Sequence, residues 1–160
     1  MDFDTFDRIL TEKRNLWGSH FTAISGGEPF IYRSQGKNLL DLAERHLDDF
    51  FLIYTNGTMI DDETAARLEE LGNITLAISV EGDEKETDER RGKGVFKKVM
   101  NTFERLRKYG VPFGISVTAT KDNWDLVTRD EFVDFYFYEQ GAFYGWLFQY
   151  MPIGRSTDLD

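Results

Sequence analysis

The sequence contains no cysteine, and histidine and proline are scarce: its 160 residues include two histidines and three prolines. Without thiols the chain can form no disulfide, and it lacks the thiolates that hold zinc or iron–sulfur clusters in most proteins. The two histidines, His20 and His46, lie too far apart in the sequence to suggest a zinc site. We therefore predict that this chain by itself binds no metal.

Basic residues are also few. Lysine and arginine total 19 against 29 aspartates and glutamates, which gives a net charge of −10. Nucleic acids and anionic membrane surfaces attract proteins through basic charge, so this balance argues against both as partners. The sequence has no apolar run long enough to span a membrane and no recognisable signal peptide. These features favour a cytoplasmic protein.

Hydrophobic residues make up 41% of the chain and aromatic residues 15%, which predicts one globular domain over residues 1–160. Apolar runs that read as strands alternate with helical spacing, and the runs lie at 21–24, 50–54, 74–80, 113–118 and 143–150. This alternation predicts an α/β fold with a parallel sheet and right-handed crossovers. Periodicity does not separate an open doubly wound sheet from a barrel.

A glycine-rich turn, Ser25-Gly26-Gly27-Glu28-Pro29, follows the first of these strands. Two glycines at a strand end let the backbone turn sharply and bring its N–H groups close to a ligand. Glu28 adds a carboxylate that can accept a charge-assisted hydrogen bond from an ammonium group. The alternative is a tight turn with a solvated acid, and the turn residues alone leave both interpretations open.

Similar motifs close the next two strands. Tyr54-Thr55-Asn56-Gly57 follows the second strand, Ser79-Val80-Glu81-Gly82 follows the third, and the segment from Arg90 to Phe96 leads into a helix. In this order the motifs resemble the radical S-adenosylmethionine (SAM) enzymes, especially the branch that modifies peptides and builds cofactors. The resemblance runs from about Phe21 to Arg155. It implies a partial TIM-type (β/α) barrel with its active site at the C-terminal ends of the strands.

The chain departs from this family in one respect. The family signature is a CxxxCxxC loop between the first barrel strand and the first helix, and it holds a [4Fe–4S] cluster. Met1 corresponds to about the start of that helix, so we expect a piece of a longer enzyme without its first strand and cluster loop. In such an enzyme the reduced cluster cleaves SAM to start radical chemistry. We expect this chain alone to be inactive, with the cluster only in the full-length parent.

The resemblance also implies a SAM site, while the catalytic residues stay unknown. The implied cofactor-binding residues are Gly26, Gly27, Glu28, Ser79, Glu81, Thr118 and Met151. The two glycines would offer backbone groups, and Glu28 would bind the amino group of SAM. Ser79 and Glu81 would bond to ribose hydroxyls, although Glu81 could equally cap a helix or stabilise a loop. Thr118 and Met151 would lie near the adenine.

Two alternatives remain at this point. The first is a binding module that keeps the barrel and has lost the cluster. The second is an ordinary α/β enzyme that uses Glu28 and Glu81 as acid–base carboxylates. In every case the substrate is unknown and could be a peptide or a small molecule. If the first strand is absent, exposed sheet edges would favour self-association.

Two further segments carry local predictions. Residues 82–94 are almost entirely polar, which predicts a mobile surface loop with Arg90 and Arg91 in a solvated charge cluster. The stretch from Phe132 to Tyr150 is rich in aromatic residues. It could form a platform for peptides, but its periodicity favours burial in the core.

Overall fold

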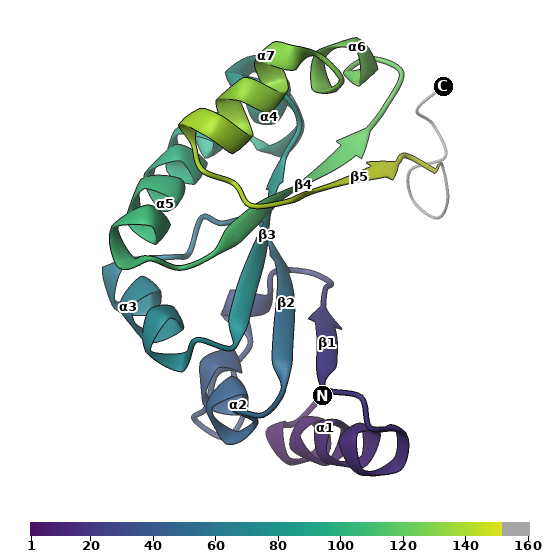
Figure 1. Cartoon of the computed structure of the whole chain (residues 1–160), viewed down its shortest axis with the longest axis vertical. Coiled ribbons are helices and arrows are strands. Elements are labelled where there is room, and N and C mark those ends of the chain that lie inside the picture. The colour runs from purple at the N-terminus through teal and green to yellow at the C-terminus, as the bar shows by residue number, and fades with distance from the viewer. Residues whose placement is uncertain (152–160) are drawn as a thin grey trace.

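The computed structural model describes residues 1–151. One parallel sheet contains the strands in sequence order, namely β1 (Phe21–Ile24), β2 (Phe50–Thr55), β3 (Ile74–Val80), β4 (Phe113–Ala119) and β5 (Gly145–Gln149). The sheet curls, and the helices form an arc around its convex side (Figure 1). The predicted α/β partial barrel with parallel strands is therefore confirmed, and β1 and β5 are the outer strands of the sheet.

Helices precede β1 and connect the strands. They are α1 (Phe3–Trp17), η1 (Pro29–Ile31, 3-10), α2 (Leu39–Arg45), α3 (Asp62–Leu71), α4 (Glu84–Arg91), α5 (Val95–Tyr109), α6 (Trp124–Val127), α7 (Asp130–Val133) and η2 (Asp134–Glu139, π-helical). Asp2 caps α1 by accepting a hydrogen bond from the Thr5 N–H, and Gly18 ends this helix in the left-handed conformation. Within residues 1–151, no helix combines the length and apolar character needed to cross a membrane.

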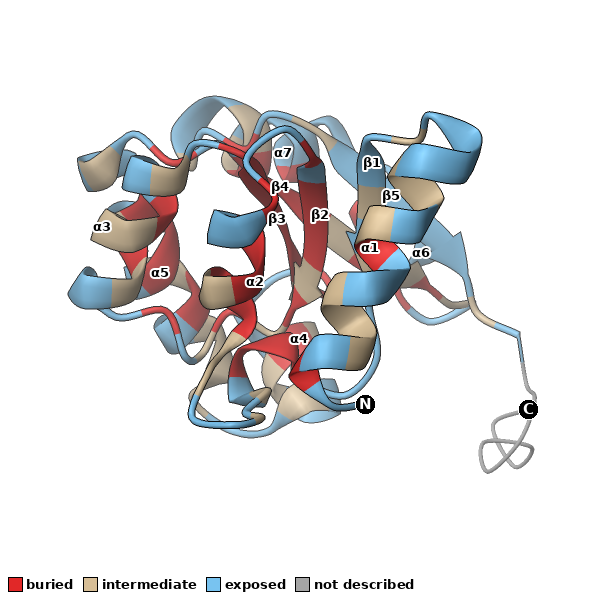
Figure 2. Ribbon diagram, turned by 90° about the horizontal axis from the view of Figure 1, so that it is seen from below, coloured by how far each residue is buried: buried red, intermediate tan, exposed pale blue. Residues whose placement is uncertain are grey.

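The main core lies between the convex side of the sheet and the helices, where Figure 2 shows the buried residues gathered. Its members include Ile53, Ile78, Val80, Phe103, Leu106, Ile115 and Val117. Because side chains alternate along a strand, the intervening residues of β3 and β4 point to the concave side. These residues are small: Ala77 pairs with Gly114, and Ser79 pairs with Ser116.

The polar segment 82–94, predicted as a loop, contains the helix α4 over Glu84–Arg91. Asp83 caps α4, and the Asp88 carboxylate accepts hydrogen bonds from the N–H groups of Gly94, at 2.5 Å, and Phe96, at 2.9 Å. These bonds connect the end of α4 to the start of α5. The periodicity missed α4 because its only buried residue is Thr87, so the helix has no apolar stripe.

The aromatic stretch after Phe132 divides into two groups. Phe132 and Tyr136 are buried, as the periodicity predicts. Tyr138 and Phe143 are largely exposed, and Trp146 is exposed to 47%. The prediction of a common core position is therefore wrong for the second half of the stretch.

Candidate functional site

The turn after β1 has an open backbone. Gly26 and Gly27 have φ angles of 100° and 53°, a region in which other residues are strained. A Cβ atom added at either position would meet no heavy atom within 4 Å. Glycine is thus required here by the backbone conformation and not by crowding, and the space beside the turn is free for a ligand.

Glu28 connects this turn to the end of β2. Its Oε1 accepts hydrogen bonds from the Thr55 hydroxyl at 2.7 Å and the Phe30 N–H at 3.1 Å. Its Oε2 accepts one from the Asn56 N–H at 2.8 Å. Glu28 therefore orders two neighbouring strand ends. Since a carboxylate oxygen can accept two hydrogen bonds, Oε2 keeps one acceptor position.

At the end of β3, Glu81 is buried, with 1% of its surface exposed. Its Oε1 accepts a hydrogen bond from Arg91 and lies 3.4 Å from Nε of Arg90. Its Oε2 is buried and has no hydrogen-bond partner among residues 1–151. The two arginines therefore pack on a buried carboxylate, and the predicted solvated charge cluster is wrong. Ser79 lies two residues earlier on the concave side.

Asn123 fixes the ends of β3 and β4 relative to each other. This buried side chain donates hydrogen bonds from Nδ2 to the backbone carbonyls of Glu81, at 2.9 Å, and Thr118, at 3.1 Å. Asn123 is not among the residues predicted from the sequence. The available signal was an asparagine in the turn after β4, since asparagine often bonds to nearby backbone.

The turn between β3 and α4 is closely packed. Gly82 has a φ angle of 146°, and a Cβ there would lie 2.5 Å from Cδ2 of Leu126. Tyr136 donates a hydrogen bond from its hydroxyl to the Gly82 carbonyl at 2.5 Å. Burial raises the pKa of Tyr136 above its ordinary value, so its hydroxyl stays a donor. This packing holds Glu81 and the start of α4 in place.

The strand ends meet at one edge of the sheet. Thr118 pairs with Phe148 near the C-terminal ends of β4 and β5, and Met151 follows β5 with most of its surface exposed. The Arg90 guanidinium lies 5.9 Å from the ring centroid of Tyr150, which places α4 near the end of β5. All the predicted SAM-site residues therefore lie at the C-terminal edge of the sheet.

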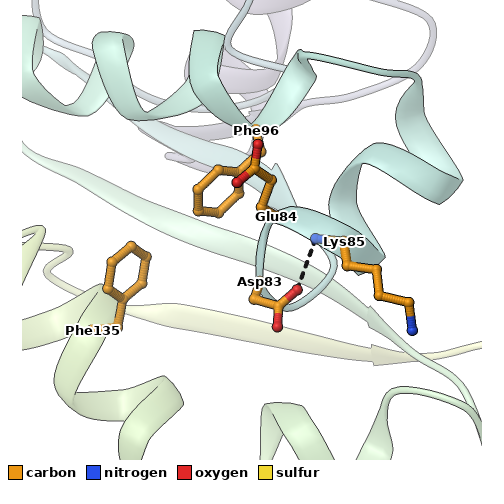
Figure 3. A pocket seen from close by; sticks show the side chains of 5 residues that line it. All are labelled: Asp83, Glu84, Lys85, Phe96 and Phe135. Carbon is orange, nitrogen blue, oxygen red and sulfur yellow. Dashed lines mark hydrogen bonds between the residues drawn. The ribbon is translucent and has the colours of Figure 1, made fainter.

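A separate pocket lies among the helices of the outer layer (Figure 3). It has a volume of about 600 Å³ and is lined by Asp83, Glu84, Lys85, Phe96 and Phe135. The two phenylalanine rings lie parallel to within 16°, with centroids 6.3 Å apart. None of the predicted SAM-site residues lines this pocket, so we place the candidate site at the strand ends.

The residues at the strand ends fit SAM but not an iron–sulfur cluster. The open glycine turn can receive the polar end of SAM, and Ser79 and Thr118 add hydroxyl groups at the same edge. A [4Fe–4S] cluster needs thiolates, and the chain has no cysteine. In the part of the chain that the structure describes, no group of three histidine, aspartate or glutamate side chains could hold a metal ion.

Comparisons with known proteins identify the family of this chain. A family model described as the radical SAM superfamily matches residues 1–135. An AdoMet-dependent heme synthase of Oleidesulfovibrio alaskensis is 35% identical over 98% of this chain and 37% of that protein. The mycofactocin maturase MftC of Mycolicibacterium smegmatis is 33% identical over 87% of this chain and 34% of that protein.

Solved structures show the same fold. Streptococcus suis SuiB has a TM-score of 0.79 at 21% identity, over 100% of this chain and 36% of that chain. The chain therefore spans 34% to 37% of the length of these three proteins. The match to the family model and the identity to the two enzymes show that the chain belongs to the radical SAM superfamily.

Proposed function

We propose that this chain is the SAM-binding part of a radical SAM enzyme. The observation that carries the proposal is the Gly26–Gly27 turn, which leaves its backbone open at the C-terminal edge of a half-barrel. SuiB, which shares the fold, has been solved with bound S-adenosylmethionine. When it is bound and reductively cleaved in the complete enzyme, SAM supplies the radical chemistry.

Each residue of the candidate site has a distinct task in this proposal. Gly26 and Gly27 present backbone groups to the methionine end of SAM. Glu28 orders the turn and uses the remaining acceptor position on Oε2 for the amino group. Ser79 and Thr118 offer hydroxyls at the neighbouring strand ends.

Glu81 acts mainly through α4 in this proposal. Its side chain is enclosed and paired with Arg91, so a ribose hydroxyl could reach it only if α4 moved. The ribose contact that the resemblance implies for Glu81 thus stays a prediction. We assign Glu81 to holding the arginines of α4 at the edge of the site, where Arg90 can balance the charge of an anionic ligand group.

Calorimetric titration of the chain with SAM tests the proposal. We expect measurable binding and a loss of roughly tenfold to a hundredfold in affinity for Glu28→Gln, because a charge-assisted hydrogen bond is lost. Glu69→Gln is the matched control, since Glu69 is exposed on α3. Absence of binding at millimolar SAM, or equal affinity of Glu28→Gln and the unchanged chain, would contradict the proposal.

The remaining expectations extend this proposal. The substrate is a peptide or a small molecule; SuiB has been solved bound to a precursor peptide, which supports the first class. We propose that the [4Fe–4S] cluster belongs to the full-length parent, that the chain is one cytoplasmic domain, and that it is inactive alone. Pairing through the edges of β1 and β5 would give self-association, which sedimentation at increasing protein concentration measures.

A further inference from the structure

The turn after β2 is held from three sides at the C-terminal edge of the sheet. The Asn56 N–H donates a hydrogen bond to Oε2 of Glu28 at 2.8 Å. The carbonyl of the next residue, Gly57, accepts one from the Thr102 hydroxyl of α5 at 2.7 Å. A Cβ added to Gly57 would lie 2.8 Å from Cγ2 of Ile78, so the turn also packs closely against β3. The backbone around Asn56 is therefore fixed in position.

The side chain of Asn56 is fixed as well. Its Oδ1 accepts hydrogen bonds from the Thr58 N–H at 2.8 Å and from the Thr58 hydroxyl at 2.7 Å. A backbone N–H can only donate, so the atom that faces it is the oxygen and the other atom of the amide is Nδ2. Nδ2 makes no hydrogen bond within residues 1–151 and is not one of their buried unpaired polar atoms. Asn56 therefore presents an oriented donor to the solvent.

Two neighbouring strand ends thus offer opposite hydrogen-bonding groups. Strands β1 and β2 pair in parallel, so the turns that follow them are adjacent. The turn after β1 contributes the remaining acceptor position on Oε2 of Glu28, and the turn after β2 contributes the Nδ2 donor of Asn56. An α-amino acid carries a donor, its ammonium group, and an acceptor, its carboxylate, on the same carbon atom. The two side chains match these two groups.

We propose that Asn56 donates a hydrogen bond from Nδ2 to the carboxylate of the methionine end of SAM, while Glu28 binds the ammonium group. This inference deepens the proposed function and rests on it, because both concern the same ligand. A neutral amide suits this place next to Glu28. A lysine or arginine would pair with the Glu28 carboxylate and compete with the ammonium group, and an acid would repel the carboxylate of SAM.

Asn56→Asp removes the donor and keeps the acceptor. The aspartate retains an oxygen for the N–H and hydroxyl of Thr58, whereas its second oxygen cannot donate when ionised. We expect calorimetric titration to show a loss of affinity for SAM of about tenfold to a hundredfold, because a charge-assisted hydrogen bond is lost. Decarboxylated SAM lacks the carboxylate, so we expect it to bind this variant no less tightly than it binds the unchanged chain.

Asn56→Ser is the second variant, since it adds no charge beside Glu28. Its hydroxyl can accept the hydrogen bond from the Thr58 N–H but is too short to replace Nδ2. We expect the same selective loss for SAM, also in case Asn56→Asp does not fold. Asn101→Asp makes the matched change of charge on the exposed side of α5 and should affect neither ligand. Glu28→Gln should weaken both ligands, because both carry the ammonium group.

The two ligands separate a binding role of Asn56 from a structural one. Equal losses for SAM and decarboxylated SAM would overturn the inference, because the substitutions would then act through the shape of the turn. Unchanged affinity of both Asn56 variants for SAM, together with a loss in Glu28→Gln, would overturn this inference alone. If the unchanged chain bound neither ligand at millimolar concentration, the proposed function would be contradicted and this inference with it.

Discussion

A buried carboxylate lies at each end of the sheet: Glu81 follows the C-terminal end of β3, and Asp49 precedes β2. Glu81 accepts a hydrogen bond from Arg91 through one oxygen. The Asp49 side chain has no exposed surface, and the nitrogens paired with it are Nδ1 of His20 at 3.3 Å, Nδ1 of His46 at 3.7 Å and Nζ of Lys13 at 3.9 Å. Both ends therefore pair a buried acid with basic side chains.

The two ends differ in what surrounds the acid. At the N-terminal end, the buried side chain of Asn73 donates from Nδ2 to the carbonyls of Ala43, His46 and Asp49, each at 3.1 Å. His46 in turn pairs with Asp7 of α1 at 2.8 Å. At the C-terminal end the acid lies at the same edge as an open glycine turn. A buried polar cluster alone therefore indicates a contribution to the stability of the fold. It indicates a binding site only where accessible backbone groups lie beside it.

The largest expected loss of stability comes from Asn73→Ala, which disrupts the buried cluster at the N-terminal end of the sheet. Three carbonyls lose their shared donor, and an unsatisfied buried group costs about 1–3 kcal/mol. We expect the free energy of unfolding, measured in urea, to fall by about 3 kcal/mol. Affinity for SAM should stay the same while the variant is folded. Asn101→Ala, on the exposed side of α5, is the control. If Asn73→Ala lowered the free energy of unfolding no more than Asn101→Ala does, or if it also weakened SAM binding, the proposed difference between the two ends of the sheet would be wrong.

A smaller loss of stability is expected at the C-terminal end from Arg91→Ala. Removing one partner of a buried ion pair costs about 3–5 kcal/mol, but Arg90 remains near Glu81, so we expect about 2 kcal/mol. Here hydrogen exchange of the α4 amides should accelerate, and SAM affinity should fall together with stability. Lys97→Ala, exposed on α5, should change neither quantity. Unchanged protection of α4 would show that the ion pair does not hold this helix.

The sequence predicts those features that depend on local conformation. The turn at Gly26 and Gly27 follows from the backbone preference of glycine. The alternation of strands and helices likewise predicts the parallel sheet. It does not predict α4, because this helix has no apolar stripe and its end contacts a carboxylate ten residues earlier through Arg91.

Contacts between distant segments could not be predicted in this way. Asn123 reaches the carbonyl of Glu81 across 42 residues of sequence. The ring of Tyr54 on β2 meets the ring of Phe148 on β5 only because the sheet curls. Both depend on the arrangement of strands in space, and the spacing of residues along the chain does not encode that arrangement directly.

The smallest effect is expected on the outer surface, where Asp62 of α3 forms an exposed polar cluster with α5. Its carboxylate lies 2.8 Å from Nζ of Lys108 and 3.0 Å from Nε of Arg105. The hydrogen bond from Lys108, followed by that from Arg105, lowers the pKa of Asp62 from 3.8 to about 2. Because the folded state lowers this pKa, the stabilising contribution is complete above pH 3.8 and is lost as the pH falls toward 2.

Urea unfolding of the unchanged chain and Asp62→Asn at several pH values between 5 and 2 measures this contribution. We expect the unchanged chain to be slightly more stable at pH 5, and we expect this difference to disappear near pH 2, where Asp62 becomes neutral. Glu63→Gln, at the next exposed position of α3, should show no such change. A difference that stays constant over the whole range would mean that Asp62 stabilises the helix pair by a means other than its charge. A difference as large as that of Asn73→Ala would remove the distinction between the enclosed cluster at the N-terminal end and an exposed cluster of similar composition.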